Sequence, residues 1–173
     1  APAYFAFPAS SFTLTGEIEE AATARPFVQV TGFGAPTMMP NFLEGPVRHL
    51  KVIKDLEARR DVFKAVKASE LYDEELSQYL ISGTLSGVVG NDVGRMVAFS
   101  PGWLENQSVW LHMSYKYYLE LLRGGLFAEF WEEAKTGLTI FMDPKQYARS
   151  PLECASFIAS SAHMDKSIHG TGF

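Results

Sequence analysis

The stretch GWLENQSVWLHMSYKYYLELLRGG, residues 102–125, decides the predicted fold. Its aromatic and aliphatic residues recur at helical spacing, and a Gly-Gly pair at its end is a common helix stop. The seven steps of about 100° from Glu105 to His112 bring both residues, with Ser108 between them, to one side of such a helix. The sequence therefore predicts a helix over about residues 104–122 that carries a polar stripe on a largely apolar surface.

The polar stripe has two interpretations. Buried polar groups normally find partners, so the stripe can be a histidine bonded to Glu or Ser inside the core. It can also be part of a binding site, because an imidazole can donate a hydrogen bond to an anion or a hydroxyl group, and a carboxylate can accept one from a sugar hydroxyl. From the residues alone, the core interpretation is favoured.

The neighbouring segments extend the helical pattern. After Pro46, apolar residues at helical spacing predict either one long helix or two helices joined end to end. A helix over about residues 126–136 follows the central one after a short connection, which favours an antiparallel helical hairpin. Together these patterns predict a mainly α domain over residues 46–173.

The other segments lack helical spacing. Residues 1–45 are rich in Pro, Gly, Thr and Phe, and we expect loops there with short strands, for example over residues 26–31. A long loop is predicted over residues 79–101, and a weaker helix or turn over about 151–160. The chain has no initiator Met and stops in a Gly-rich stretch, so we expect a fragment of a longer protein.

Composition limits the class of protein. The 173 residues suit one domain of ordinary size, and 47% hydrophobic with 20% charged residues is a globular balance. A net charge of −5 argues against a nucleic-acid partner, and no apolar run has the length of a membrane span. The single cysteine, Cys154, excludes a disulfide within the chain and suits a reducing compartment, so we expect a cytoplasmic protein with Cys154 as a small core residue.

Potential metal ligands and acid–base groups are present but form no specific motif. His163, Asp165 and His169 lie close together, yet their spacing fits no zinc pattern. We therefore expect loop histidines that meet solvent or a ligand, and no metal. Pairs of carboxylates serve glycoside cleavage, although the spacing does not select a pair among the candidates Glu105, Asp143, Glu153 and Asp165.

The run ENQSVWLH, residues 105–112, resembles the Glu-Asn-Gly-small-aliphatic-aromatic-x-His element of the cellobiose phosphorylase family of glycoside phosphorylases. The wider pattern is similar to a branch of large bacterial proteins described as cellobiose-phosphorylase-like. The similar pieces are NFLEGPVR, LYD, the GWLEN run with WLHM and YKY, and a C-terminal stretch with DP, RSPLE and SFIASSAH, at residues 41–48, 71–73, 102–117 and 143–173.

This resemblance implies a fold and an activity. The fold would be part of an α/α barrel of helical hairpins, and the parent enzyme would cleave β-glucosides such as cellobiose by phosphorolysis, releasing glucose 1-phosphate with inversion. By resemblance, His112 would hold the attacking phosphate, while the sugar would contact Glu105, Asn106, Ser108, Glu153 and His163. Inorganic phosphate would be the co-substrate, with no other cofactor, and the general-acid Asp would lie upstream of Ala1.

The chain also departs from the family pattern. Gln107 replaces the usual Gly, and Cys154 and Met164 stand where the closer branch has Asn and Pro. Two alternatives therefore stay open: an inverting glycoside hydrolase with a similar barrel, and a noncatalytic helical module that binds carbohydrate or acts as a scaffold. The expected partners are an oligosaccharide and phosphate, without nucleic acid or membrane, and a homo-oligomer of the parent protein is left open.

Overall fold

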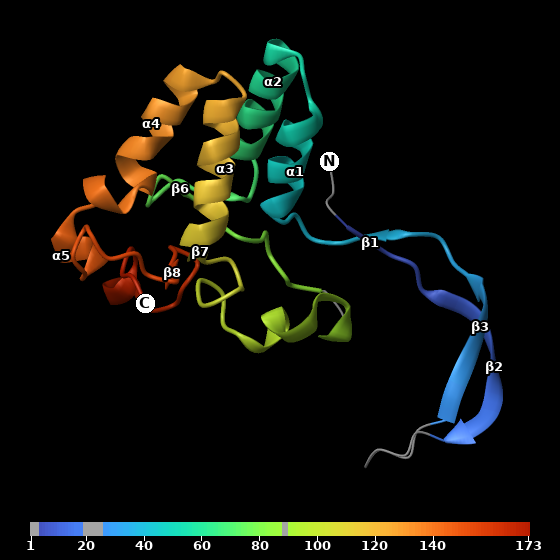
Figure 1. Cartoon of the computed structure of the whole chain (residues 1–173). Helices are drawn as coiled ribbons and strands as arrows, with labels where there is room; N and C mark the ends of the chain where they lie inside the picture. Colours follow the sequence, from blue (N-terminus) through green and yellow to red (C-terminus); the bar gives the residue numbers. More distant parts are fainter. Residues whose placement is uncertain (1–3, 19–25, 88–89) are drawn as a thin grey trace. The chain divides into compact units, whose positions relative to one another are not determined.

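The computed structural model describes residues 4–18, 26–87 and 90–173 of the chain (Figure 1). These residues divide into two compact units, one spanning Tyr4–Met39 and the other containing Pro40–Phe173. Each unit has its own secondary structure and is described separately.

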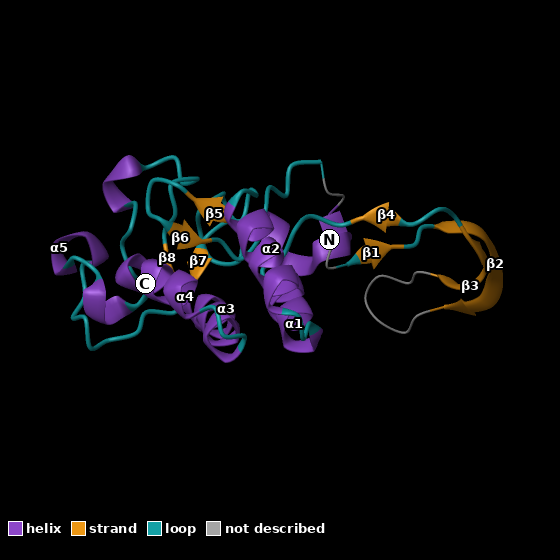
Figure 2. Cartoon of the chain, turned by 90° about the horizontal axis from the view of Figure 1, so that it is seen from above, coloured by secondary structure: helices purple, strands orange, loops and turns teal. Residues whose placement is uncertain are grey.

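The first unit is made of paired strands. β1 (Phe5–Ala6) pairs with β4 (Thr37–Met38), and the longer strands β2 (Ala9–Ile18) and β3 (Pro26–Phe33) form an antiparallel ribbon, drawn in orange in Figure 2. The strand predicted over residues 26–31 lies within β3. Its partner β2 was not predicted because its Ser- and Thr-rich sequence shows only poor alternation of apolar and polar residues.

The second unit combines helices with short strand pairs. In chain order its elements are α1 (Glu44–Val52), α2 (Leu56–Lys67), β5 (Tyr72–Asp73), β6 (Gln78–Tyr79), the 3-10 helix η1 (Gly90–Ala98), β7 (Val109–Trp110), α3 (Leu111–Arg123), α4 (Phe127–Gly137), η2 (Thr139–Phe141), α5 (Pro144–Tyr147), β8 (Phe157–Ile158) and η3 (Lys166–Ile168). β5 pairs with β6 and β7 with β8, both antiparallel. Among the described helices, none combines the length and the apolar character needed to cross a membrane.

The prediction of a mainly α fold, as part of an α/α barrel, is wrong. The structure is 39% helical and 21% strand, with the strands in several small antiparallel sheets, so the fold is mixed α/β. The physical reason is pairing between distant segments: β7 meets β8 across the chain, and β2 meets β3, where local spacing indicated helix or loop. Such pairing overrides local propensity because it satisfies backbone groups and buries apolar side chains together.

The helical part of the second unit surrounds its larger apolar core. Leu43, Val47 and Leu50 at α1 pack in one cluster with Tyr117 and Leu121 of α3. α4 follows α3 directly, as the predicted helical hairpin requires, and the two helices pack side by side (Figure 1). A smaller second core contains Val109, Leu111, Tyr147 and Ile158.

The chain between residues 46 and 71 forms two helices, which decides between the alternatives that the sequence left open. Ile53 is extended after α1, and Asp55 begins α2 by accepting a hydrogen bond from the Ala58 amide at 2.8 Å. An N-cap carboxylate satisfies a helix amide that otherwise has no partner.

Replacing Asp55 by alanine should lower the free energy of unfolding by about 1 kcal/mol, the usual loss for an N-cap side chain. Urea unfolding followed by circular dichroism measures the change. Asp55→Asn serves as the control because an asparagine can also cap, and it should retain most of the stability. An equal loss in both variants would contradict the capping role.

Candidate functional site

The predicted polar stripe does not lie on a helix. α3 begins at Leu111, so Glu105 and Ser108 precede it and only His112 is helical. The preceding residues turn tightly: Trp103 and Asn106 form a bridge, and three residues adopt left-handed backbone conformations, namely Gly102 (φ 78°), Leu104 (φ 48°) and Gln107 (φ 55°). The helix predicted from residue 104 is therefore wrong at its start.

Asn106 and Ser108 stabilise this loop of residues 102–108. Asn106 is 5% exposed, and its Nδ2 donates to the Phe99 carbonyl at 2.6 Å while its own carbonyl accepts from the Gly102 amide at 2.8 Å. Ser108 is fully buried, and its hydroxyl donates to the Leu104 carbonyl. Both side chains thus shape the loop from inside, and for Ser108 this agrees with the core interpretation of the stripe.

Glu105 lies differently, at the edge of the loop. Its side chain is 17% exposed, and Arg95 of η1 forms an ion pair with its Oε1 atom. The other carboxylate oxygen, Oε2, is buried and has no hydrogen-bond partner in the described part of the chain. A buried carboxylate oxygen without a donor is unfavourable and calls for one, such as a water molecule or a ligand hydroxyl.

A second segment packs against this loop near the end of the chain. The Ser160 amide donates to the Gly102 carbonyl at 3.2 Å, and the Ser160 hydroxyl donates to the Gln107 carbonyl. His163 follows, and its ring centroid lies 5.7 Å from that of Trp103. The structure therefore brings His163 against the loop that carries Glu105, although the two residues are far apart in sequence.

Aromatic side chains support both segments. The Trp103 ring makes edge contacts with Phe157 at 5.0 Å and with Phe173 at 4.6 Å, and Trp110 stacks on Phe157 at 6.0 Å. Trp103 and Trp110 are only partly buried, whereas Phe157 is buried between them. A partly exposed indole offers a flat apolar surface next to polar loop groups, which is a common composition of ligand sites.

His112 and Glu153 lie apart from this arrangement. His112 is exposed in the first turn of α3, and Glu153 is exposed and paired with Arg149 at 2.8 Å. Within the described residues, no hydrogen bond or ion pair joins either side chain to residues 102–108. Cys154 is also exposed, which contradicts its expected place in the core.

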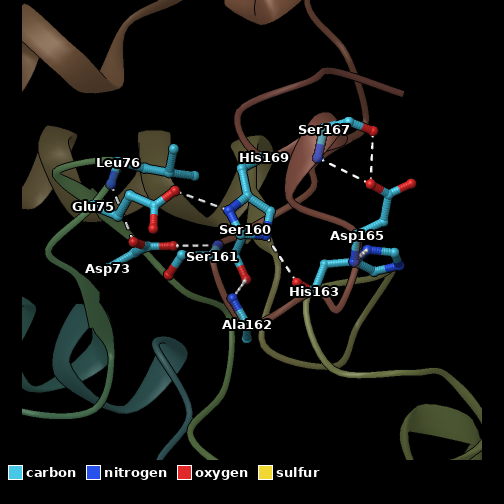
Figure 3. A network of polar contacts seen from close by, with 10 residues as sticks. All are labelled: Asp73, Glu75, Leu76, Ser160, Ser161, Ala162, His163, Asp165, Ser167 and His169. Atoms are coloured by element: carbon cyan, nitrogen blue, oxygen red, sulfur yellow. Dashed lines mark hydrogen bonds and ion pairs between the residues drawn. The ribbon is translucent and has the colours of Figure 1, made fainter.

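A polar network that the sequence did not predict holds the segment of residues 160–169 (Figure 3). Asp73 accepts hydrogen bonds from the amides of Leu76 at 3.1 Å and Ser161 at 2.8 Å, and the His169 ring contacts Glu75 at 2.9 Å. Asp73 and Glu75 belong to a segment about ninety positions earlier in the chain, so no local signal could reveal these contacts.

The described residues offer few other sites for a metal ion or a small ligand. The described residues contain no group of three or more His, Cys, Asp or Glu side chains placed to hold a metal ion. Asp165 instead accepts hydrogen bonds from the hydroxyl and amide of Ser167, which lower the pKa of its carboxyl group. A separate pocket of 120 Å³ beside α5 is lined in part by Gln78, Asp143 and Tyr147.

Comparisons with known proteins leave the family unassigned. No protein-family model matches the chain. No curated protein shows significant similarity to it.

Proposed function

We propose that this chain contributes a sugar- and phosphate-binding surface to a glycoside phosphorylase that converts β-glucosides, such as cellobiose or β-glucan oligosaccharides, to glucose 1-phosphate with inversion. The observation that carries the proposal is Glu105, whose buried Oε2 atom lacks a donor within the described residues, in the same loop that carries the partly exposed Trp103. The resemblance of residues 102–117 and 143–173 to cellobiose-phosphorylase-like proteins adds the reaction type.

The chemistry of the proposed sugar subsite follows from these groups. The Glu105 carboxylate accepts a hydrogen bond from a sugar hydroxyl through Oε2, while Arg95 neutralises its charge through Oε1. The Trp103 ring supplies an apolar surface for the sugar ring, and the His163 ring lies next to it. Asn106 and Ser108 act indirectly, because their hydrogen bonds fix the shape of the loop that carries Glu105.

By the resemblance, phosphate would bind at His112, at the start of α3. His112 is exposed in the first turn of this helix, so its imidazole is accessible to an anion. In the proposed reaction a phosphate oxygen attacks the anomeric carbon while the glycosidic bond breaks on the opposite face. The proton for the leaving oxygen comes from an acid that the resemblance places outside this chain.

Replacing Glu105 by glutamine should weaken binding of cellobiose to the chain about tenfold, because a hydrogen bond to a charged acceptor is lost. Isothermal titration calorimetry in the presence of inorganic phosphate measures this change. Glu57→Gln is the matched control, since Glu57 also pairs with an arginine but lies on α2. Equal affinities for the wild type, Glu105→Gln and Glu57→Gln would contradict the sugar subsite.

The full-length parent protein tests the reaction type. We expect release of glucose 1-phosphate from β-glucan oligosaccharides only when phosphate is present, and a His112→Ala variant should need more phosphate for the same rate. Cleavage without phosphate would identify a hydrolase instead. Sugar binding without any turnover would identify a noncatalytic carbohydrate-binding protein.

A further inference from the structure

His169 is a buried histidine with an acceptor at each ring nitrogen (Figure 3). It is 8% exposed, its Nδ1 atom lies 2.9 Å from Glu75 Oε1, and its Nε2 atom lies 2.8 Å from the His163 carbonyl oxygen. A carboxylate and a carbonyl both accept hydrogen bonds, and a neutral imidazole carries only one N–H group. Only the doubly protonated ring can donate to both.

The surroundings favour that protonated form. The hydrogen bond to the His163 carbonyl, followed by the one to Glu75, raises the pKa of His169, and the charges of Glu75 and Asp73 act in the same direction. Asp165, on the same segment as His169, is a further negative charge that interacts with the ring. Burial opposes protonation, but it is outweighed by these contacts.

The group that His169 holds is the backbone of His163. The His163 amide donates to the Ser160 carbonyl at 3.1 Å, and the His163 Nδ1 atom accepts from the Asp165 amide at 3.1 Å. The His163 ring is therefore fixed by the Asp165 amide, next to Trp103. The contact between His169 and the His163 carbonyl ties His163 itself to Glu75, whereas the Asp73–Ser161 hydrogen bond holds the segment two residues earlier.

We propose that His169 is a positioning residue for the sugar-binding site: as an imidazolium it joins Glu75 to the backbone of His163 and so keeps the His163 ring beside Trp103. The expected effect of His169 on sugar binding rests on the proposed function. It assigns no contact between His169 and the ligand.

The sign of the pH dependence follows from the direction of the pKa shift. Because the folded protein raises the pKa of His169, its stabilising effect is complete below the unfolded value of about 6.5 and is lost as pH rises through the folded value. Loss of the proton removes one of the two hydrogen bonds. The affinity for cellobiose should then fall as the pH rises through the folded pKa of His169, because the His163 ring is held less firmly.

The test uses NMR on the whole chain. At about pH 6, both ring nitrogens of His169 should carry protons, and the backbone amide signals of residues 161–165 should move with the same midpoint as His169 when the pH is raised. Glu75→Gln keeps an acceptor but removes the charge, so it should move that midpoint to lower pH. Glu74→Gln is the matched control, because Glu74 is the exposed neighbour of Glu75. Calorimetry with cellobiose and inorganic phosphate over the same pH range measures the binding consequence.

Three outcomes decide the matter. A neutral His169 ring at about pH 6, or equal midpoints in Glu75→Gln and Glu74→Gln, overturns the proposal. Cellobiose affinity that stays constant while His169 titrates also overturns it. Absence of cellobiose binding at every pH, with the linked movement of the His163 signals intact, rejects the proposed function and leaves the positioning of His163 supported.

Discussion

Replacing Gly102 by alanine should destabilise the chain by about 3 kcal/mol and displace the His163 segment. Gly102 has a φ of 78°, and a Cβ atom added to it would lie 2.4 Å from the His163 amide nitrogen and 2.7 Å from the His163 Cβ atom. The left-handed conformation costs a non-glycine residue about 1 kcal/mol or more, and the backbone contact adds a steric cost of similar size or larger. Urea unfolding gives the change in free energy.

Gly87→Ala is the matched control for this prediction. Gly87 has a φ of 83°, but within the described residues no atom lies within 4 Å of an added Cβ atom. This variant should therefore lose only the conformational part, about 1 kcal/mol. Equal losses in the two variants would show that the close approach between Gly102 and His163 does not exist in solution.

Replacing Lys67 by methionine should lower the free energy of unfolding by about 3 kcal/mol. The Lys67 ammonium group lies 2.7 Å from Oε1 of both Glu132 and Glu133. Glu133 is only 2% exposed, so loss of Lys67 leaves a buried carboxylate without its cation. The nearby tyrosines cannot replace the cation, because a phenol is either neutral or negative, and burial, followed by the Glu133 charge, raises the pKa of Tyr117 and Tyr118 and keeps them neutral.

Two further variants separate the buried pair from the exposed one. Glu132 is 64% exposed, so Glu132→Gln should change stability by about 0.5 kcal/mol or less. Adding Glu133→Gln to Lys67→Met removes the uncompensated charge and should recover part of the loss in chemical denaturation. If the double variant is no more stable than Lys67→Met alone, the buried charge is not the cause.

The helices show what local sequence could predict. Apolar spacing predicted α4, and it predicted α3 with a start that was too early, because these helices bury one face against a core. The Gly-Gly stop was also right, since α3 ends at Arg123 and Gly125 takes a φ of 81°. The start of α3 was not predictable, because Val109 and Trp110 pair with β8, and this distant pairing interrupts the helical pattern.

The candidate site was predictable only in part. The sequence singled out Glu105 and His163, which the structure brings into one region through contacts of Gly102 and Trp103. It could not indicate that Asn106 and Ser108 turn inward, because two of the left-handed residues of this loop, Leu104 and Gln107, are not glycines. The contact between Glu75 and His169 spans 94 positions, and only the folded chain reveals it.

The strand pair β7–β8 has a consequence for the order in which parts of the protein can fold during its synthesis. Translation proceeds from the N-terminus, so Trp103 and Asn106 leave the ribosome well before the segment that completes their surroundings. That segment includes Phe173, which contacts the Trp103 ring and accepts hydrogen bonds from the amides of Ser156 and Phe157. The helical core of α1 and α3 can form on the nascent chain, whereas the loops of the candidate site must wait until residue 173 has emerged.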